Sequence, residues 1–235
     1  MNILIIGYGK MGKMIETIAL ERGHQIAGIV DINDSLHDID AKNIDVAIDF
    51  TTPDSVLNNI DICLNKNIPL VVGTTGWYDN LEAIKNKVEA ENKSFLYSPN
   101  FAIGVYLFRE INKILAKTMD NYSNYTPEIT EIHHIHKLDA PSGTAIILAN
   151  ELLKEYSWKK EWKLNEIEDS NQLKITSIRE GEEFGTHIIT YESQEDIIEI
   201  KHKAKSRRGL ALGAVLAAEF LKGKKGFFTM QDMIK

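Results

Sequence analysis

The sequence has 235 residues, of which 43% are hydrophobic and 26% charged, a composition typical of a soluble globular protein with one large domain or two small ones. Its 27 basic and 34 acidic side chains give a net charge of -7, and no run of like charge resembles a nucleic-acid-binding arm. No apolar run suits a signal peptide or a membrane span, and the single cysteine, Cys63, cannot form an intramolecular disulfide. We therefore expect a cytoplasmic protein that binds neither nucleic acid nor membrane.

Short apolar runs alternate with amphipathic stretches up to about Phe101, which is the pattern of a parallel sheet with crossover helices. Helical spacing of apolar residues, such as Ile15, Ile18 and Ala19, marks the helices between the strands. In such sheets ligands bind at the carboxyl ends of the strands, where polar or glycine-rich turns follow in this sequence. The predicted strands are residues 2–6, 25–30, 45–50, 68–72 and 94–97.

The pattern changes after residue 104. One more helical stretch is followed by strand-like segments that predict a second, mostly antiparallel domain, interrupted by one helix over about 141–156 and a surface loop over 157–172. The segment 209–223 is apolar nearly all round, so it should be a helix buried against the first domain. We expect an α/β fold with a Rossmann-type doubly wound parallel sheet, formed by 1–104 and 208–235, and an inserted α+β mixed-sheet domain, 105–207.

Three glycines in G-x-G-x-x-G spacing, Gly7, Gly9 and Gly12, lie between the first predicted strand and helix. They suit a tight turn, close approach of the backbone to a pyrophosphate, and close packing of helix on strand. Asp31 ends the second predicted strand, where a carboxylate accepts from a ribose 2′-OH and repels a 2′-phosphate, which favours NADH over NADPH. Glycines that serve only packing and a solvated Asp31 are the alternatives, and the nearby Lys10 weakens the preference for NADH.

Two further turns extend the same edge of the predicted sheet, DFTTP at residues 49–53 and GTTGW at residues 73–77. Their hydroxyls and N–H groups would lie near the ribose and nicotinamide of a cofactor. Thr51 and Thr52 could instead cap the following helix, since threonine is a preferred capping residue. The paired glycines of the second turn indicate close approach of the backbone to another group.

Residues 131–145, EIHHIHKLDAPSGTA, concentrate titratable side chains before a turn. On a strand, Glu131 and His133 would share one face and positions 134 and 136 the other, so this segment offers at most two metal ligands. No third ligand is evident from His187 or His202, and we expect no metal site. Histidines exposed in a surface loop remain an alternative.

A helix predicted to begin near Ser142, Gly143 and Thr144 presents N–H groups suited to an anion such as a carboxylate. Lys137 and His134 add cationic or hydrogen-bonding groups nearby in the sequence. Such a set suits a small dianion and proton transfer near neutral pH.

These motifs, with SPNFAIGV before the second domain and HKAKSRRGLALGAV after it, resemble the 4-hydroxy-tetrahydrodipicolinate reductase (dihydrodipicolinate reductase) family of lysine and diaminopimelate biosynthesis over essentially the whole chain. The resemblance implies reduction of a cyclic dicarboxylate, 4-hydroxy-tetrahydrodipicolinate, to tetrahydrodipicolinate by NADH or NADPH. It also implies a second domain for substrate binding and oligomerisation, hinges between the domains, and a homotetramer. Rival interpretations are another two-domain Rossmann dehydrogenase and an NAD(H)-sensing regulator, although the DNA-reading element of a regulator is missing.

The resemblance also assigns roles to residues. His133 matches the proton donor and acceptor, and Lys137 the general acid. Arg207 matches an arginine near the hinge or is a solvated charge, and residues 158–171 have no counterpart that could be aligned. The implied substrate contacts are His134, Lys137, Ser142, Gly143 and Thr144. The implied cofactor contacts are Gly7, Tyr8, Gly9, Lys10, Met11, Gly12, Asp31, Phe50, Thr51, Gly73, Thr74, Thr75, Ser98, Pro99, Asn100 and Phe101.

Overall fold

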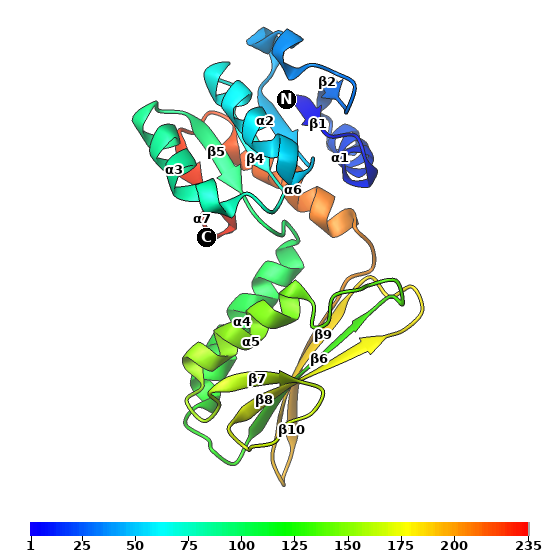
Figure 1. Ribbon diagram of the computed structural model, residues 1–235, viewed down its shortest axis with the longest axis vertical. Helices are drawn as coiled ribbons and strands as arrows, with labels where there is room; N and C mark the ends of the chain where they lie inside the picture. The colour runs from blue at the N-terminus through cyan, green and yellow to red at the C-terminus, as the bar shows by residue number, and fades with distance from the viewer. Residues whose placement is uncertain (235) are drawn as a thin grey trace. The chain divides into compact units, whose positions relative to one another are not determined.

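The computed structural model describes residues 1–234, which divide into two compact units (Figure 1). The first unit comprises Met1–Ile103 and the segment that begins at Arg208, and the second unit comprises Gly104–Arg207. Among residues 1–234, no helix has the length and apolar character needed to cross a membrane.

The first unit is built on a parallel sheet with the strand order β11-β5-β4-β3-β1-β2. Since β2 and β3 lie on opposite sides of β1, the order reverses at β1 and creates the kind of switch point at which α/β sheets bind ligands. The five predicted strands are confirmed, but β11 was not predicted because it has only three residues at a sheet edge. The strands are β1 (Asn2–Ile6), β2 (Gln25–Val30), β3 (Val46–Asp49), β4 (Leu70–Val72), β5 (Ser94–Tyr97) and β11 (Gly226–Phe228).

Helices cover this sheet. The predicted buried helix near the end of the chain is confirmed as α6, which contacts α1 and the strands β3, β4 and β5. Helix α6 packs against the segment that follows β5, so closely that a Cβ on Gly213 would lie 1.7 Å from the carbonyl oxygen of Phe101. The helices are α1 (Lys10–Glu21), α2 (Pro53–Asn65), α3 (Leu81–Ala90), α6 (Arg208–Leu221) and α7 (Met230–Met233), with short 3-10 turns η1 (Leu36–Asp38), η2 (Ala41–Asn43) and η3 (Tyr78–Asn80).

The strands of the first unit are apolar on both faces because both faces are covered. Leu4 and Ile6 of β1 belong to a buried cluster with residues of α2 and α3, while Ile3 and Ile5 point to the opposite face and are equally buried. Burying each such side chain contributes about 1.5–3 kcal/mol. This packing holds the strand ends, and the turns that follow them, in fixed positions.

The second unit has a five-stranded sheet with the order β10-β9-β6-β8-β7. The pairs β6/β9 and β9/β10 are antiparallel, whereas β6/β8 and β7/β8 are parallel. The predicted mixed sheet is therefore confirmed, although the expected predominance of antiparallel pairing was wrong. The helix α5 returns the chain across the sheet after β6, which allows β7 to run parallel to β6, and the segment between residues 164 and 172 returns it again before β8. The elements are α4 (Ile103–Met119), β6 (Thr126–His133), α5 (Gly143–Glu155), β7 (Glu161–Leu164), β8 (Gln172–Arg179), β9 (Thr186–Glu192) and β10 (Ile197–Lys203).

The strand β7 lies inside the segment predicted to be a loop, so that prediction was wrong for Glu161–Leu164. Helices α4 and α5 lie side by side against one face of the sheet (Figure 1). They are joined by an ion pair of Arg109 with Glu151 and by a hydrogen bond of 3.1 Å from Asn112 Nδ2 to the Leu148 oxygen. The apolar core beneath them supports the end of β6 and the start of α5.

Candidate active site

The glycine-rich turn after β1 has the geometry that its spacing predicts. Gly7 adopts φ +87°, and a Cβ there would lie 2.3 Å from the Phe50 oxygen. A Cβ on Gly12 would lie 2.2 Å from the Gly7 oxygen, so this glycine brings α1 close to the turn. Around Gly9, which precedes the first residue of α1, the space is open, so its backbone can be approached by a phosphate.

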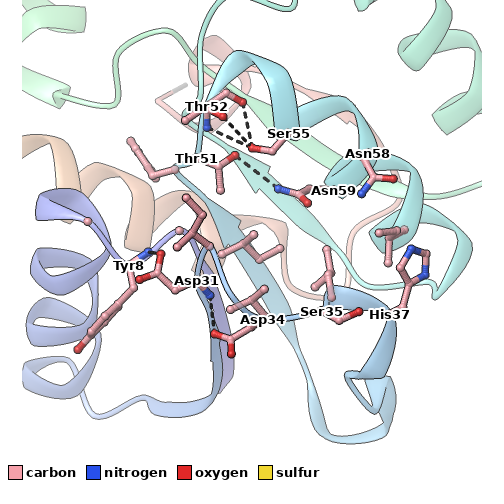
Figure 2. Close-up of a pocket in the computed structure, with 18 residues that line it drawn as sticks. Tyr8, Asp31, Asp34, Ser35, His37, Thr51, Thr52, Ser55, Asn58 and Asn59 are labelled. Carbon is pink, nitrogen blue, oxygen red and sulfur yellow. Dashed lines mark hydrogen bonds between the residues drawn. The ribbon is translucent and has the colours of Figure 1, made fainter.

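A cavity of about 630 Å³ lies at the carboxyl ends of β1, β2 and β3, at the switch point of the sheet (Figure 2). Its position and size suit part of a dinucleotide. Of the predicted cofactor contacts, those that line it are Gly7, Tyr8, Gly9, Asp31, Phe50 and Thr51. Those that do not line it are Lys10, Met11, Gly12, Gly73, Thr74, Thr75, Ser98, Pro99, Asn100 and Phe101.

One wall of this cavity is acidic. Asp31 Oδ1 accepts a hydrogen bond of 3.3 Å from the Tyr8 nitrogen, and Asp34 Oδ2 accepts one of 2.8 Å from the Asp31 nitrogen. Among the described residues that line the cavity there is no lysine or arginine, and His37 is the one basic side chain. Figure 2 shows Asp31 and Asp34 near Tyr8 and His37 near Ser35. Asp34 and His37 were not predicted, because the segment after β2 in which they lie carries no recognisable motif.

A buried carboxylate organises the turns after β3 and β4. Asp49 Oδ1 accepts hydrogen bonds from the hydroxyls of Thr74, at 2.6 Å, and Thr51, at 2.8 Å, and its Oδ2 accepts one of 2.8 Å from Asn59 Nδ2. Burial raises the pKa of Asp49, which these hydrogen bonds oppose. Thr52, rather than Thr51, caps α2, in a reciprocal arrangement with Ser55. The predicted cofactor contact Thr74 therefore uses its hydroxyl within the protein.

Two other predicted cofactor contacts, Gly73 and Phe101, lie near the ring of Phe50. A Cβ on Gly73 would lie 2.2 Å from the Phe50 ring, so any other residue there would require this ring to move. The ring of the buried Phe101 lies 6.1 Å from that of Phe50. The Ser98 hydroxyl donates to the Asn100 oxygen at 2.7 Å. These contacts fix the shape of the strand-end turns in the first unit.

In the second unit, β6 ends at His133, and three buried side chains meet there: Glu131, His133 and His187. Their ligand atoms all lie within 4.8 Å of one another, so the expectation that His187 offers no third group was wrong. The reason is cross-strand pairing, since Glu131 lies opposite His187 in the antiparallel pair of β6 and β9. A local pattern cannot reveal that register.

Protein groups supply partners for this cluster. One oxygen of Glu131 contacts His133 Nδ1, and the other accepts a hydrogen bond of 3.0 Å from Arg179 Nη1. His187 Nε2 lies 3.2 Å from the Ser142 hydroxyl. Burial, together with the charge of His133, lowers the pKa of His187 to about 3, so His187 is neutral near pH 7. Arg179 supplies the positive charge that a buried carboxylate needs.

The loop after β6 carries the other predicted substrate groups. Lys137 Nζ lies 2.7 and 2.8 Å from the two carboxylate oxygens of Asp139, and this contact lowers the pKa of Asp139. The nitrogen of His134 donates to the Glu183 oxygen at 2.8 Å. His136 is exposed, with 66% of its side chain accessible. The ammonium of Lys137 is thus paired with a surface carboxylate, Asp139, and an anionic ligand could replace this partner.

Helix α5 begins as predicted beside Ser142. The Ser142 hydroxyl caps the helix by accepting from the Ala145 nitrogen at 3.2 Å. Gly143 is exposed, and no atom lies within 4 Å of the position that a Cβ would occupy, so its backbone can be approached freely. The first N–H groups of a helix have no partner within the helix and favour an anion. Because His187 contacts Ser142 and lies 5.2 Å from His133 between ring centroids, the anion site and the Glu131 cluster are neighbours.

An acid-walled cavity at the switch point of a parallel sheet, beside strand-end turns that contain glycines, places this chain in the Rossmann-type class of nucleotide-binding folds. The chain belongs to the dihydrodipicolinate reductase family: the model of the family's N-terminus matches residues 1–101, and that of its C-terminus matches residues 104–234. The predicted family and the predicted oxidoreductase class are confirmed.

Several similar proteins bear the name 4-hydroxy-tetrahydrodipicolinate reductase. One from Christiangramia forsetii is 47% identical over 100% of this chain and 98% of its own length. One from Thermosipho africanus is 36% identical over 100% of this chain and 98% of its own length. One from Staphylococcus aureus is 35% identical over 99% of this chain and 100% of its own length.

Solved structures show the same fold. A dipicolinate-bound dihydrodipicolinate reductase from Paenisporosarcina sp. TG-14 matches with a TM-score of 0.80 and 24% identity over 100% of both chains. A probable dehydrogenase from Thermotoga maritima matches with a TM-score of 0.57 and 9% identity over 99% of this chain and 92% of its own. The fold is therefore shared well beyond recognisable sequence similarity.

Proposed function

We propose that the protein reduces 4-hydroxy-tetrahydrodipicolinate to tetrahydrodipicolinate with a nicotinamide cofactor. The observation that carries the proposal is the pairing of a buried Glu131–His133 contact with a helix N-terminus at Ser142, both touching His187. One feature suits proton transfer and the other a carboxylate. The relatives named for this reaction match along essentially the whole chain, and one related structure contains dipicolinate, a cyclic dicarboxylate.

The reaction adds one hydride and one proton to the substrate and releases its hydroxyl as water. When bound, the nicotinamide supplies the hydride. Lys137 leaves Asp139, neutralises a substrate carboxylate and donates the proton that the departing hydroxyl needs. His133 takes a proton from the ring and returns it, so the net uptake from solvent is one proton. These are the roles assigned to the catalytic residues His133 and Lys137.

The substrate-binding role falls to the start of α5. The N–H groups of Gly143 and Thr144 and the hydroxyl of Ser142 hold one carboxylate, and His134 contributes a ring nitrogen. A dicarboxylate that is held at both ends, here by Lys137 as well, cannot rotate away from the groups that react with it.

For the cofactor we propose NADH over NADPH. Asp31 and Asp34 would face a 2′-phosphate with two carboxylates, whereas Asp31 can accept from a ribose hydroxyl. Lys10, which could have offset this charge, is exposed and does not line the cavity.

We also propose a homotetramer in which the second unit supplies contacts between copies. Leu107, Ile111 and Ile114 are spaced to form one stripe of α4 and are 46%, 51% and 69% exposed. On β10, Ile197 is 59% exposed. Apolar side chains grouped in this way mark interaction surfaces. Light scattering after gel filtration should give four times the mass of 26.6 kDa, and a monomer mass would contradict the proposal.

The function is tested by mixing the protein, NADH and the enzyme that generates the unstable substrate. We expect loss of NADH absorbance only in the complete mixture, and inhibition by 2,6-pyridinedicarboxylate, a planar mimic of the substrate. A dehydrogenase of another class would ignore this mimic. Stable NADH in the complete mixture would contradict the proposal.

A further inference from the structure

Glu131 lies fully buried on β6, two residues before His133, so both side chains leave the same face of the strand. One of its carboxylate oxygens contacts Nδ1 of His133, and the other accepts from Nη1 of Arg179 at 3.0 Å. Burying a carboxylate is costly unless it is paired and hydrogen-bonded. The His133 ring is therefore held by a charged group that is itself fixed.

Arg179 ends β8 and lies opposite His133 in the parallel pairing of β6 and β8. Besides Glu131, its guanidinium donates to the main-chain oxygens of Asp139, at 2.6 Å, and Lys137, at 3.3 Å. A guanidinium presents five donors in a planar fork, which a lysine ammonium cannot reproduce. Arg179 thus ties the loop that carries Lys137 to the strand end that carries His133.

A glycine leaves room for the His133 ring next to its other nitrogen, Nε2. Gly185, just before β9, adopts φ +140°, and a Cβ there would lie 3.0 Å from Nε2 of His133. The neutral His187 packs nearly perpendicular to the His133 ring. Charged or titratable side chains beside the His133 ring include Glu131 on β6 and His187 on β9, and Arg179 on β8 contacts Glu131. Lys137, in the following loop, and His202, on β10, act electrostatically on His187.

We propose that Glu131 and Arg179 are positioning residues for the reaction: Glu131 accepts a hydrogen bond from Nδ1 of His133 and so presents Nε2 for proton exchange, while Arg179 holds Glu131 and the Lys137 loop in one arrangement. This inference rests on the proposed function, in which His133 carries the proton. An ionised carboxylate can only accept a hydrogen bond, so Glu131 keeps a proton on Nδ1 of His133. An amide can accept or donate, so it would not fix the position of this proton.

The carboxylate of Glu131 is ionised over the range in which the enzyme would work. Burial alone raises the pKa of Glu131, but hydrogen bonds from His133 and Arg179 outweigh burial and hold that pKa at about 2. Glu182 offers a matched control, because it contacts the exposed His136 at 3.0 Å in a nearby loop with 78% of its side chain accessible.

The first test follows the ring nitrogens of labelled histidine by NMR across pH in wild type, Glu131→Gln and Glu182→Gln, with His133→Gln to assign the signal. We expect a protonated Nδ1 on His133 in wild type, and a transition of this ring that moves to lower pH by about one unit or more in Glu131→Gln, because a carboxylate favours the charged ring. The control should leave that transition in place. An unmoved His133 signal in Glu131→Gln would overturn the positioning role even if the wild type is fully active. A moved signal supports that role even if the wild type does not reduce this substrate.

The second test is kinetic. We expect Glu131→Gln to lower kcat by at least about tenfold with KM for the substrate nearly unchanged, and to move the pH-rate profile in step with the NMR transition. Arg179→Lys keeps the charge but loses the fork, and we expect a similar loss of kcat. Full activity of Arg179→Lys would exclude a positioning role for Arg179.

If Glu131→Gln does not fold, Glu131→Asp shortens the side chain, which moves the carboxylate away from His133 and allows the same measurements. Activity that is lost on chelation and restored by zinc would overturn the proposal in favour of a metal site.

Discussion

The carboxylate of Asp49 accepts a hydrogen bond from the hydroxyl of Thr74 at 2.6 Å, and so joins the turn after β3 to the turn after β4 from inside the first unit. Asp49 is fully buried and also accepts from Thr51 and Asn59. The shape of the proposed cofactor site therefore depends on a side chain that does not line the cavity.

Replacing this carboxylate should weaken cofactor binding. In Asp49→Asn one acceptor oxygen becomes a donor that faces other donors, and we expect the dissociation constant for NADH to rise about tenfold, equivalent to about 1.4 kcal/mol. Asp61→Asn is the control, since Asp61 lies on the surface with 64% of its side chain exposed. Fluorescence titration with NADH measures the effect, and wild-type affinity in a folded Asp49→Asn would refute it.

Cofactor choice should depend on the acidic wall of the cavity. In a variant with both Asp31→Asn and Asp34→Asn, we expect the ratio of kcat/KM for NADPH to that for NADH to rise by at least about tenfold, because the repulsion of a 2′-phosphate is removed. Asp38→Asn, which changes an exposed carboxylate outside the cavity lining, should leave this ratio unchanged. An unchanged ratio in the double variant would show that other groups select the cofactor.

Loss of the Lys137 ammonium should affect chemistry more than cofactor binding. For Lys137→Met we expect kcat/KM for the substrate to fall by about a hundredfold or more, in the range typical of a removed general acid, with NADH affinity unchanged. Lys163→Met provides the control, because Lys163 is exposed on β7 and its ammonium forms a long ion pair of 3.8 Å with Glu161. Near-normal turnover of Lys137→Met would exclude this lysine from the reaction.

The buried His187 should make stability depend on pH. Its pKa is lowered to about 3 in the folded protein from an ordinary value of 6.5, so only the unfolded chain binds the proton between these values. The free energy of unfolding should therefore fall as pH drops below about 6.5. The lowered pKa of Glu131 acts in a separate range, below about pH 4.5.

Melting temperatures of wild type and His187→Gln between about pH 7 and 5 test this dependence. We expect a smaller decrease with falling pH in His187→Gln, whatever its starting stability, and a wild-type decrease in His136→Gln, which alters an exposed histidine. Equal decreases in wild type and His187→Gln would mean that His187 does not stay neutral in the folded protein.

The parts of the fold that could be predicted are the strands and helices that have a clear local pattern of apolar residues. The strands β1, β2 and β5 begin and end at the predicted residues because each is an apolar run bounded by polar or glycine-containing turns. The edge strand β7, with the sequence EWKL, alternates polar and apolar residues over only four positions, too short a pattern to separate from a loop.

The parts of the site that could not be predicted depend on contacts between distant segments. Glu131 and His133 share a strand face, and their spacing predicts as much. The partners His187 and Arg179 come from β9 and β8. A local sequence pattern does not indicate which residues of these two strands pair with residues of β6. Asp49 was missed because it is the last residue of the buried strand β3, next to a polar turn, and its hydrogen-bond partners Thr74 and Asn59 come from other segments.

Transfer of deuterium from NADH labelled at nicotinamide C4 tests the central claim most directly. The product formed with the substrate-generating enzyme is analysed by mass spectrometry, with unlabelled NADH as the reference. We predict tetrahydrodipicolinate that carries the deuterium in the wild type, and its formation at a greatly reduced rate in Lys137→Met. Product without deuterium, or oxidised NADH without tetrahydrodipicolinate, would contradict the proposed reaction.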